Sequence, residues 1–558
     1  MKKIKKISYF GAVVLSFVLI ATSMNVLGTQ QDPSKKNIQV VHKRAIPARE
    51  HASVSGIKQS VALDDIPSIT SLSTDIQVTS APEKENNPAL GADLDEDFLL
   101  AYTFEDDVTS TKIPWTFSID GGQTFDSGVY YDLVGTESHP ATDYRGSAKK
   151  FVGTLQGDPI EGEGAIQYLF TCDDPTNYET YTLVYWTWAD SYPYSNRRIS
   201  DIAGYDGLDI PWWYGMTACV GTRGAPGSVD MPIFNYNDYA DETQGWSNYF
   251  ANYSGCKNAA IDIDQTNGYF YAVFDYLNVT KGDWDLLLFR GDCHNDGEGH
   301  PIFFNVTLIG GSENTTNPAI AVDGNKIQIL AQTDAAGTQD VICYYSDDAG
   351  NTWDSALVAQ ANDADETYPS IVSYGTYATC LYTKDQNIAV CYTEDGGATW
   401  TTTEQVNDVN GMVQSECRNM DIANDGTVVW TDLRNGNADI YLDNVGGTPP
   451  QARLELGNIT FGIGTVSAVI KNIRDADAVN TNVTITVTGG IFGRVNAIKT
   501  VNTTIGAGEE ITVTTDGYIF GLGQIEIMVF ASCTVAVPPT IKITVDATLF
   551  IVFIKGIL

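Results

Sequence analysis

The sequence predicts an all-β protein, a six- or seven-bladed β-propeller followed by a small β-sandwich. Three observations predict this fold class. Short apolar runs alternate with polar turns along most of the 558 residues, and the 51 Gly and 29 Tyr favour strands over helices. A strand-opening pattern returns every 50 to 60 residues, which is the spacing of stacked supersecondary units. Beyond residue 450 this repeat stops, and shorter runs of apolar/polar alternation follow.

Residues 1–28 have the pattern of a secretory signal peptide. Four lysines among the first six residues precede an apolar stretch, Ile7 to Leu27, and Val26-Leu27-Gly28 offers a small-residue cleavage site. We therefore expect a secreted, extracellular or cell-surface protein. The apolar stretch is about 20 residues long, so an uncleaved membrane anchor is the alternative. Residues 29–75 are polar and lack a period, which predicts a linker or disordered spacer.

The chain is strongly acidic, with 32 Lys plus Arg against 70 Asp plus Glu and a formal net charge of −38. Such a surface repels phosphate backbones, so nucleic acid is not an expected partner. We expect contact with a membrane only through an uncleaved N-terminal anchor. Seven Asn-x-Ser/Thr sequons fit an exported glycoprotein. They begin at Asn252, Asn278, Asn305, Asn314, Asn458, Asn482 and Asn502.

Nine cysteines without a Cys-x-x-Cys pair leave the disulfide pairing open. The odd number leaves at least one thiol free or intermolecular, and Cys380 with Cys391 are spaced to close a hairpin. Small buried strand residues are the alternative interpretation for most of the cysteines.

Seven copies of the strand opening divide residues 76–447 into units. In each copy a polar turn leads into a short apolar strand. The copies begin at Asn87, His139, Arg197, Lys257, Asn317, Tyr368 and Arg418, at intervals of 52, 58, 60, 60, 51 and 50 residues. Four strands in about 50 residues, repeated radially, make a propeller blade. Seven openings indicate seven blades, but those at Arg197 and Lys257 are the least regular, so six is the alternative.

Three stretches share a second pattern, in which a strand leads into Ser/Thr-x-Asp-x-Gly-x-Thr-Trp/Phe. Each residue type has a physical role there. The Asp carboxylate accepts backbone N–H groups, Gly takes a positive φ, and the aromatic ring packs against a neighbouring sheet. The defining residues are Ser118, Asp120, Gly122 and Phe125 in the first copy, Ser346, Asp348, Gly350 and Trp353 in the second, and Thr393, Asp395, Gly397 and Trp400 in the third.

This second pattern resembles the Asp box, or BNR repeat, of sialidase-like β-propellers. The resemblance implies a six-bladed propeller in which each box is a structural turn, remote from the site. If the boxes join strand three to strand four, the strand openings lie on the opposite rim, around the central channel. That arrangement places one set of side chains near a single mouth, namely His139, Arg197, Arg198, Lys257, Tyr368 and Arg418.

In sialidases three Arg clamp the substrate carboxylate at this mouth, beside a Tyr–Glu nucleophile pair and an Asp acid. Arg suits that role because its planar fork matches a carboxylate. This sequence departs from the pattern, because its first unit has no Phe/Tyr-Arg-Ile-Pro motif. The nearest string, Arg198-Ile199-Ser200-Asp201, lacks the proline and lies in the third unit. We therefore assign no catalytic residue, and arginines in surface or inter-blade salt bridges are the alternative.

Aromatic residues form another candidate cluster on both sides of Arg197. Sugar rings stack on aromatic plates, so exposed aromatic side chains near the arginines suit a glycan. Trp212 and Trp213 follow Pro211 in a predicted loop and are the better ligand candidates, whereas Tyr185 to Trp188 is interpreted as an inter-blade core strand. The candidate binding residues are therefore His139, Arg197, Arg198, Trp212, Trp213, Tyr368 and Arg418.

Two acidic stretches raise the question of a metal, but we assign no metal ligand. Asp292 to His300 holds two of the five His and three carboxylates, in a spacing that matches no ligand pattern, so a structural turn is preferred. Asp262-Ile263-Asp264 before Asn267-Gly268 is similar to a calcium loop, but its Gly is one place late for an EF-hand. No cofactor is expected, and calcium is the alternative.

Residues 451–558 follow Gly446-Gly447-Thr448-Pro449-Pro450, which marks a domain boundary. Short alternating runs separated by Gly and Asn turns over about 100 residues predict an immunoglobulin-like β-sandwich. The pattern resembles the adhesion modules appended to many prokaryotic surface proteins. Ala547 to Leu558 is too short to span a bilayer and is predicted to be the last strand, with a docking tail as the alternative.

The preferred function is non-catalytic binding of a glycan or a cell-surface protein by the propeller. An exo-acting, sialidase-like glycoside hydrolase of acidic sugars and a structural component of the cell envelope are the alternatives. Three Arg converging at one mouth opposite a carboxylate favour the enzyme. A mouth lined by aromatic rings and amides favours the binder.

Overall fold

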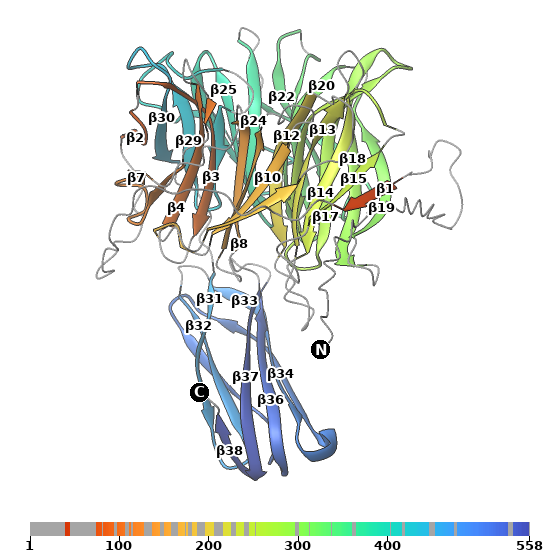
Figure 1. The fold of residues 1–558 in the computed structure, drawn as a ribbon, viewed down its shortest axis with the longest axis vertical. Helices are drawn as coiled ribbons and strands as arrows, with labels where there is room; N and C mark the ends of the chain where they lie inside the picture. The colour runs from red at the N-terminus through yellow and green to blue at the C-terminus, as the bar shows by residue number, and fades with distance from the viewer. Residues whose placement is uncertain are drawn as a thin grey trace, which may run out of the picture.

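The computed structural model consists almost entirely of antiparallel β-sheets (Figure 1). It describes residues 40–44 and 74–556 apart from short gaps. The gaps are residues 81, 94–97, 107–110, 113–114, 128–136, 146–149, 158–165, 173, 177–180, 187–195, 206–215, 225–229, 239–244, 251–252, 296–300, 312, 336, 360–363, 402, 416–418, 446–451, 474–476 and 534–539. Outside these gaps the only helix is the 3₁₀ turn η3 (Ile491–Gly493), and no described helix is long and apolar enough to cross a membrane.

Seven sheets correspond to the seven predicted units, and the first four occupy residues 84–309. Blade 1 holds β3 (Lys84–Asp93), β4 (Phe98–Asp106), β5 (Thr111–Lys112), β6 (Trp115–Ser118) and β7 (Asp126–Ser127). Blade 2 holds β8 (Glu137–Arg145), β9 (Lys150–Gly157), β10 (Ile166–Cys172) and β11 (Tyr181–Trp186). Blade 3 holds β12 (Asn196–Tyr205), β13 (Met216–Gly224), β14 (Met231–Asp238) and β15 (Gly245–Phe250). Blade 4 holds β16 (Cys256–Ile263), β17 (Tyr269–Asn278), β18 (Asp283–Asn295) and β19 (Pro301–Ile309).

The remaining three blades occupy residues 315–444 and borrow one strand from the start of the propeller. Blade 5 holds β20 (Thr315–Asp323), β21 (Lys326–Thr333), β22 (Asp340–Ser346) and β23 (Asp354–Ala359). Blade 6 holds β24 (Glu366–Tyr374), β25 (Tyr377–Lys384), β26 (Asn387–Thr393) and β27 (Glu404–Gln405). Blade 7 holds β28 (Met420–Ile422), β29 (Thr427–Asp432), β30 (Asp439–Asn444) and, from the N-terminal side, β2 (Ile76–Gln77).

The first strands of the seven sheets form a closed ring. Each packs against the first strand of the next blade, in the order β3, β8, β12, β16, β20, β24 and β28, and β28 returns to β3. The predicted all-β propeller is confirmed, and the ring fixes the number of blades at seven, so the six-bladed alternative is wrong. The two irregular openings, at Arg197 and Lys257, each belong to an inner strand of their own, β12 and β16.

Blade 7 closes the ring because strands from both ends of the propeller share its sheet. β2 pairs with β30, and Arg434 holds the junction. A guanidinium nitrogen of Arg434 lies 2.6 Å from a carboxylate oxygen of Asp75, just before β2, and 2.6 Å from one of Asp432. The guanidinium carbon lies 4.0 Å from the Tyr441 ring centroid. Burial raises the pKa of Asp75. For Asp432 burial acts in the same direction, but hydrogen bonds from Arg434 and Trp430 outweigh it and lower the pKa.

Aspartates on the inner strands join neighbouring blades. In each case one carboxylate oxygen accepts the N–H of the following residue, and the other accepts an N–H from the next blade. Asp262 shows the arrangement, accepting Ile263 N–H and Val322 N–H at 2.7 Å each. The same pair of bonds joins Asp143 to Gly204, Asp201 to Ile261, and Asp421 to Leu90. Blades 2 to 5 and the closure from blade 7 to blade 1 are therefore linked by one repeated device.

The blade sheets pack through large apolar side chains. Between blades 3 and 4, Phe234 lies 4.6 Å from Phe270 and 5.3 Å from Phe303, measured between ring centroids, and Phe250 stacks on Phe289 at 4.3 Å. In the later blades the buried core includes Cys343, Cys380 and Cys391 beside the large side chains of Tyr382 and Trp430. Cys380 and Cys391 are register partners across β25 and β26, and both are free thiols.

Residues 454–556 form a two-layer sandwich beneath the propeller (Figure 1). One sheet has β31 (Leu454–Phe461), β32 (Val466–Asn472) and β35 (Glu510–Thr514). The other has β33 (Ala478–Gly489), β34 (Val495–Ile505), β36 (Gly521–Ser532), β37 (Thr540–Ile551) and β38 (Phe553–Gly556). The two sheets share one buried core, which includes Ile470, Ile485 and Val529. The inward-facing positions alternate with outward ones along β33 and β36, as a sandwich requires.

Strand direction decides which loops share a rim of the propeller. The first strand of each blade starts at one rim, so the turns from strand three to strand four lie at the opposite rim. The stretches beginning at Ser118, Ser346 and Thr393 follow third strands, β6, β22 and β26, and therefore lie at that opposite rim. The sandwich follows β30, a third strand, so it is attached at the same rim. The rim that holds the strand openings therefore faces away from the sandwich.

One prediction about another segment needs correction, and a second segment is described only in part. Val40–Arg44 lies in the predicted linker, 29–75, but forms β1, which pairs with β15 at the outer edge of blade 3. Tyr185 and Trp186, in the predicted inter-blade core strand, belong to β11 (Tyr181–Trp186), the outermost strand of blade 2, whereas Thr187 and Trp188 lie outside the described residues. Both β1 and β11 are edge strands, and the pairing of an edge strand with its sheet is hard to recognise from the polarity of its own sequence.

Candidate functional site

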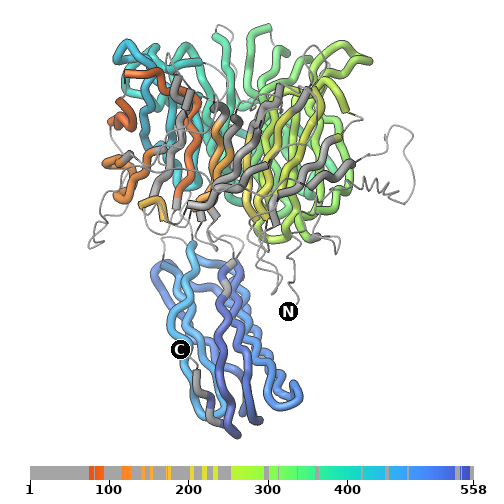
Figure 2. The backbone as a smooth tube through the Cα atoms, in the orientation of Figure 1, coloured from red at the N-terminus to blue at the C-terminus, as the bar shows by residue number. Residues whose placement is uncertain are grey.

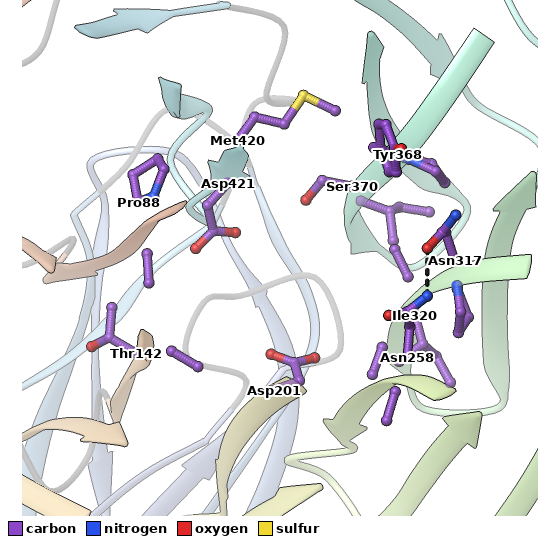
Figure 3. A pocket seen from close by; sticks show the side chains of 18 of the residues that line it. Pro88, Thr142, Asp201, Asn258, Asn317, Ile320, Tyr368, Ser370, Met420 and Asp421 are labelled. Carbon is purple, nitrogen blue, oxygen red and sulfur yellow. Dashed lines mark hydrogen bonds between the residues drawn. The ribbon is translucent and has the colours of Figure 1, made fainter. Parts of the chain in front are cut away.

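The central channel holds a cavity of about 200 Å³ that all seven blades line (Figure 3). Every lining residue comes from the opening of a first strand. They are Pro88, Ala89, Pro140, Ala141, Thr142, Asp201, Asn258, Ala259, Ala260, Asn317, Pro318, Ala319, Ile320, Tyr368, Pro369, Ser370, Ile371, Met420 and Asp421. The repeated opening motif of the sequence is therefore the lining of the channel.

A β-bulge at six of the seven openings aims these residues at the channel. Six of the seven described inner strands shift register there, for example between Asn86 and Ala89 in β3 and between Thr367 and Ser370 in β24. A bulge bends the strand and re-aims its side chains. Three equivalent residues immediately before a proline have positive φ: Asn87 at 50°, Asn317 at 52° and Tyr368 at 54°. Asn tolerates this conformation, whereas a bulky Tyr is rarely found in it.

A chain of amide side chains runs along one wall of the cavity, across blades 4, 5 and 6. The Asn258 amide donates to Asp275 at 2.9 Å and to the Asn317 side-chain oxygen at 2.6 Å. Asn317 in turn donates to the Gln332 side-chain oxygen, which also accepts the Tyr368 backbone N–H at 3.2 Å. Figure 3 shows Asn258 and Asn317 joined at the edge of the cavity. This network holds the polar wall in one arrangement.

Two carboxylates line the cavity on either side of this amide wall, Asp201 from blade 3 and Asp421 from blade 7 (Figure 3). Both belong to the inter-blade device, so each accepts two backbone N–H groups at 2.9–3.0 Å. As lining residues, both contribute carboxylate oxygens to the cavity wall. The pair therefore presents fixed hydrogen-bond acceptors to the cavity.

Burial governs the acidity of the carboxylates behind the lining. Burial raises the pKa of Asp275 to about 7, although hydrogen bonds from Asn258 and Asn317 oppose it. The pKa of Asp262 also rises well above the ordinary value because of desolvation, with the neighbouring charges of Asp143 and Asp201 adding to the shift. Desolvation disfavours the charged form of a buried carboxyl group. The channel wall is therefore backed by groups that hold protons more firmly than a surface Asp.

The structure places one predicted binding residue, Tyr368, in the cavity wall (Figure 3). The backbones of His139, Arg197 and Arg198 lie in the first strands β8 and β12, but their side chains lie outside the described part of the structure. Trp212, Trp213 and Arg418 lie outside the described residues altogether. Lys257, expected at the same mouth, is exposed, and its ammonium lies 4.3 Å from the Trp284 ring centroid.

The sequence analysis missed Asp201, Asp421, Asn258 and Asn317 as lining residues. A signal for the aspartates was present, because an Asp follows the opening motif within a few residues in several units, at Asp143, Asp201, Asp262 and Asp421. The amide chain had no such signal, since Gln332 and Asp275 come from second strands far from the openings.

The acidic stretches considered for a metal have structural roles where they are described. Asp262 joins blades 4 and 5, and Asp264 accepts Thr266 N–H at 2.8 Å in the following turn. Asp292 and His294 continue β18 and their side chains are hydrogen-bonded to each other, so this part of the predicted turn is a strand. Among the described residues, no group of three His, Cys, Asp or Glu is placed to hold a metal ion.

The three Asp-containing turns have the same hydrogen bonds. In the second copy, Asp348 accepts the Thr352 backbone N–H and hydroxyl at 2.8 Å each, and Ser346 Oγ accepts Gly350 N–H at 2.8 Å. The Trp353 indole N–H donates to the Gly350 carbonyl at 3.1 Å. The copies at Asp120 and Asp395 repeat the carboxylate bonds. These turns lie at the rim opposite the strand openings and contribute nothing to the cavity lining.

Comparison with known proteins gives distant likenesses of shape only. No family model and no curated protein matches the sequence. Similar solved structures include a Trypanosoma rangeli sialidase in complex with the inhibitor DANA, at 10% identity and a TM-score of 0.36, covering 78% of this chain and 89% of that one. Prolyl oligopeptidase B from Galerina marginata matches at 10% identity and a TM-score of 0.37, covering 69% and 56%.

An acylaminoacyl peptidase in complex with Z-Gly-Gly-Phe-chloromethyl ketone also matches, at 10% identity and a TM-score of 0.37. The match covers 70% of this chain but only 58% of the peptidase. Likenesses this distant carry no conclusion about activity. The assignment of a propeller rests on the closed ring of seven sheets.

Proposed function

We propose that this protein is an exported, non-catalytic binding protein that holds uncharged sugar units of a glycan at the mouth of its propeller channel. The observation that carries the proposal is the cavity lining itself. Carboxylates, amides, hydroxyls and one Tyr converge there on rigid inner strands. Sugar hydroxyls are donors that suit fixed carboxylate acceptors, and an aromatic ring offers a stacking face.

The size of the cavity supports partial burial of such a ligand. At about 200 Å³ it is smaller than the roughly 300–1,000 Å³ of small-molecule sites. It therefore accepts one end of a ligand, and the remainder rests on the rim that faces away from the sandwich. The apolar N-terminal stretch of the sequence supports export of the propeller to a place where glycans are displayed.

The same lining argues against hydrolysis of an acidic sugar. Asp201 and Asp421 would repel a substrate carboxylate, and none of the described lining residues is an Arg or Lys. A general acid must also exchange its proton with the substrate. Asp201 and Asp421 instead use both oxygens to accept backbone N–H groups that join the blades. We therefore prefer binding to sialidase-like catalysis.

A pair of tyrosines in blade 6 tests the proposal on a glycan array of neutral and sialylated sugars. Tyr368→Asn removes the ring at the mouth but keeps a residue that accepts positive φ, as Asn87 and Asn317 do at the equivalent position. Tyr377→Asn, at the start of β25 on the opposite rim, is the matched control. We expect neutral glycans to bind, Tyr368→Asn to weaken binding by about tenfold, or about 1.4 kcal/mol, and Tyr377→Asn to leave it unchanged.

A hydrolysis assay with fluorogenic neutral sugars and a sialoside distinguishes the enzyme alternative. Turnover that Asp201→Asn abolishes would overturn the non-catalytic proposal. Preferential binding of sialylated glycans, unaffected by Tyr368→Asn, would overturn the assignment of the site and of the ligand class.

A further inference from the structure

The end of the sandwich farthest from the propeller carries a cluster of exposed large apolar side chains. The turns between β31 and β32, β33 and β34, β35 and β36, and β37 and β38 all lie at this end, because the strands alternate in direction (Figure 2). Phe492 is 89% exposed, Tyr518 76%, Phe520 72%, Phe550 63% and Ile463 61%. We call these four turns the distal tip.

Backbone hydrogen bonds hold three of the four turns together and tie the other to its own sheet. Gly464 N–H donates to the Val552 carbonyl at 2.5 Å, and Ile519 N–H donates to the Gly464 carbonyl at 2.7 Å. On the other sheet, Gly490 N–H donates to the Gln524 carbonyl at 2.6 Å. The exposed rings are therefore presented from a rigid support.

These side chains are not unused core residues. The sandwich has its own closed core, formed by inward-facing positions of both sheets. Contiguous exposed apolar surface is rare on soluble proteins and marks a place of interaction. Each large side chain left in water forgoes about 1.5–3 kcal/mol of burial free energy. Five such residues in adjoining turns indicate a surface that is covered in the functional state.

The charge of the chain identifies what covers the tip. Residues 451–558 hold eight Asp plus Glu and seven Lys plus Arg, a net charge of −1, so −37 of the total −38 lies in residues 1–450. The tip segments 461–466, 489–496, 515–523 and 547–558 contain two cations, Arg494 and Lys555, and one acidic residue, Asp516, which forms an ion pair with Lys499 at 2.9 Å. The Arg494 guanidinium lies 5.9 Å from the Phe492 ring centroid. In a very acidic protein, this apolar end carries two cations and a single acid that is already paired with Lys499.

From this combination we propose that the distal tip docks on a lipid bilayer that contains anionic lipids. Phe and Tyr side chains enter the interfacial region, and Arg494 lies close to phosphate headgroups. Insertion is shallow, because turn backbones exposed to hydrocarbon would leave N–H and C=O groups without partners. The strongly acidic propeller then stands away from the anionic surface, and its channel mouth faces outward. This contact is separate from the N-terminal anchor considered above.

A site-specific fluorescent label on the full chain tests the proposal without interference from the N-terminal apolar stretch. Phe492→Cys carries the environment-sensitive nitrobenzoxadiazole group at the tip. Val279→Cys carries the same label as the matched control. Val279 is 79% exposed and lies in the turn after β17, at the rim that holds the strand openings. The described native cysteines are all buried, and the unsubstituted chain measures background labelling. The probe is phosphatidylcholine vesicles with and without phosphatidylglycerol.

We expect the label at position 492 to brighten and shift to the blue with vesicles, more strongly with phosphatidylglycerol, and the label at 279 to stay unchanged. Adding Phe520→Ser and Phe550→Ser should weaken vesicle binding by about tenfold for each ring removed, since burial of one ring contributes about 1.5–3 kcal/mol. An unchanged label at 492 with vesicles overturns the proposal. So does a blue shift that depends on protein concentration without vesicles, which would assign the tip to a second copy of this chain.

Discussion

At the scale of single residues, the same side chain type has different roles at the two rims of the propeller. At one rim Asp120, Asp348 and Asp395 accept several donors within a tight turn, and the hydrogen bonds lower the pKa of each. Behind the channel lining, desolvation raises the pKa of Asp262 and of Asp275. Exposure to water, and not the residue type, decides which form of the carboxyl group the fold favours.

Two adjacent aspartates in the turn after β22 provide a test of the structural role of the Asp-containing turns. Asp348→Ala removes the acceptor of three hydrogen bonds and should lower the melting temperature clearly. Asp347→Ala, the control, removes only an exposed ion pair with Lys326 and should change it little. Thermal unfolding followed by circular dichroism compares the two. Equal melting temperatures for both variants would contradict the structural role of Asp348.

At the scale of elements, the inner strand is the unit that combines stability with a site. Its bulge aims the opening residues at the channel, and a few residues later its Asp is bonded to the next blade. The two features are linked, because the bulge sets which side of the strand faces the neighbouring blade. A substitution in this strand therefore acts on blade packing and on the cavity together.

Asp262 offers the sharpest test of the inter-blade device. Asp262→Ala leaves two buried N–H groups, of Ile263 and Val322, without an acceptor, at about 1–3 kcal/mol each. We expect a loss of unfolding free energy of roughly 2–6 kcal/mol in urea titration. Asp262→Asn keeps one acceptor oxygen and removes a buried charge, so it should lose less than half as much. A loss below about 1 kcal/mol for Asp262→Ala would show that the blades do not depend on this bond.

At the scale of the whole molecule, the acidic groups lower stability in two ways, by repulsion across the surface and by burial of carboxyl groups. The net charge of −38 repels itself across the surface. Several buried carboxyls have raised pKa values because of burial, about 6 for Asp264 and Asp443 and about 7 for Asp275. Closing the ring of seven blades therefore places acids where their charged form is disfavoured.

The resulting pH dependence has a definite sign. When folding raises the pKa of an Asp, the folded state is fully favoured only while the group stays protonated, that is, below the unfolded-state pKa of 3.8. This contribution to stability is lost as the pH rises through the folded-state pKa, about 6 for Asp264 and Asp443 and about 7 for Asp275. The lowered pKa values of the turn aspartates act oppositely, and their stabilisation is lost as the pH falls below about 4. We expect a higher melting temperature at about pH 5 than at about pH 8, with a decline below about pH 3.

Differential scanning calorimetry across this pH range measures the effect, with Asp275→Asn as the companion variant. Because Asn has no charge to disfavour, the variant should show a smaller fall in melting temperature from the acidic to the alkaline side. A melting temperature that rises through the same range would contradict the assignment of raised pKa values to the buried carboxyls.

Local sequence pattern was sufficient to predict the all-β propeller class. The strand openings repeat because each blade must start its first strand at the same rim, and that requirement repeats a short motif at a fixed spacing. Apolar/polar alternation and turn residues likewise predicted a β-sandwich in residues 451–558, where the structure has a two-layer sandwich. These features depend on neighbours along the chain, which a single sequence displays directly.

Tertiary structure alone decided the rest, because it depends on contacts between residues far apart in the chain. The ring closes at seven through β2 and Arg434, which come from opposite ends of the propeller. Tyr368 was predicted at the mouth from its place in the motif. The wall formed by Asn258, Asn317 and Gln332 could not be predicted in this way, because its hydrogen bonds join different blades. The distal tip likewise gathers four turns spread over about 90 residues of sequence, from Ile463 to Phe550. Chain alternation between sheets, which no local pattern encodes, brings those turns together.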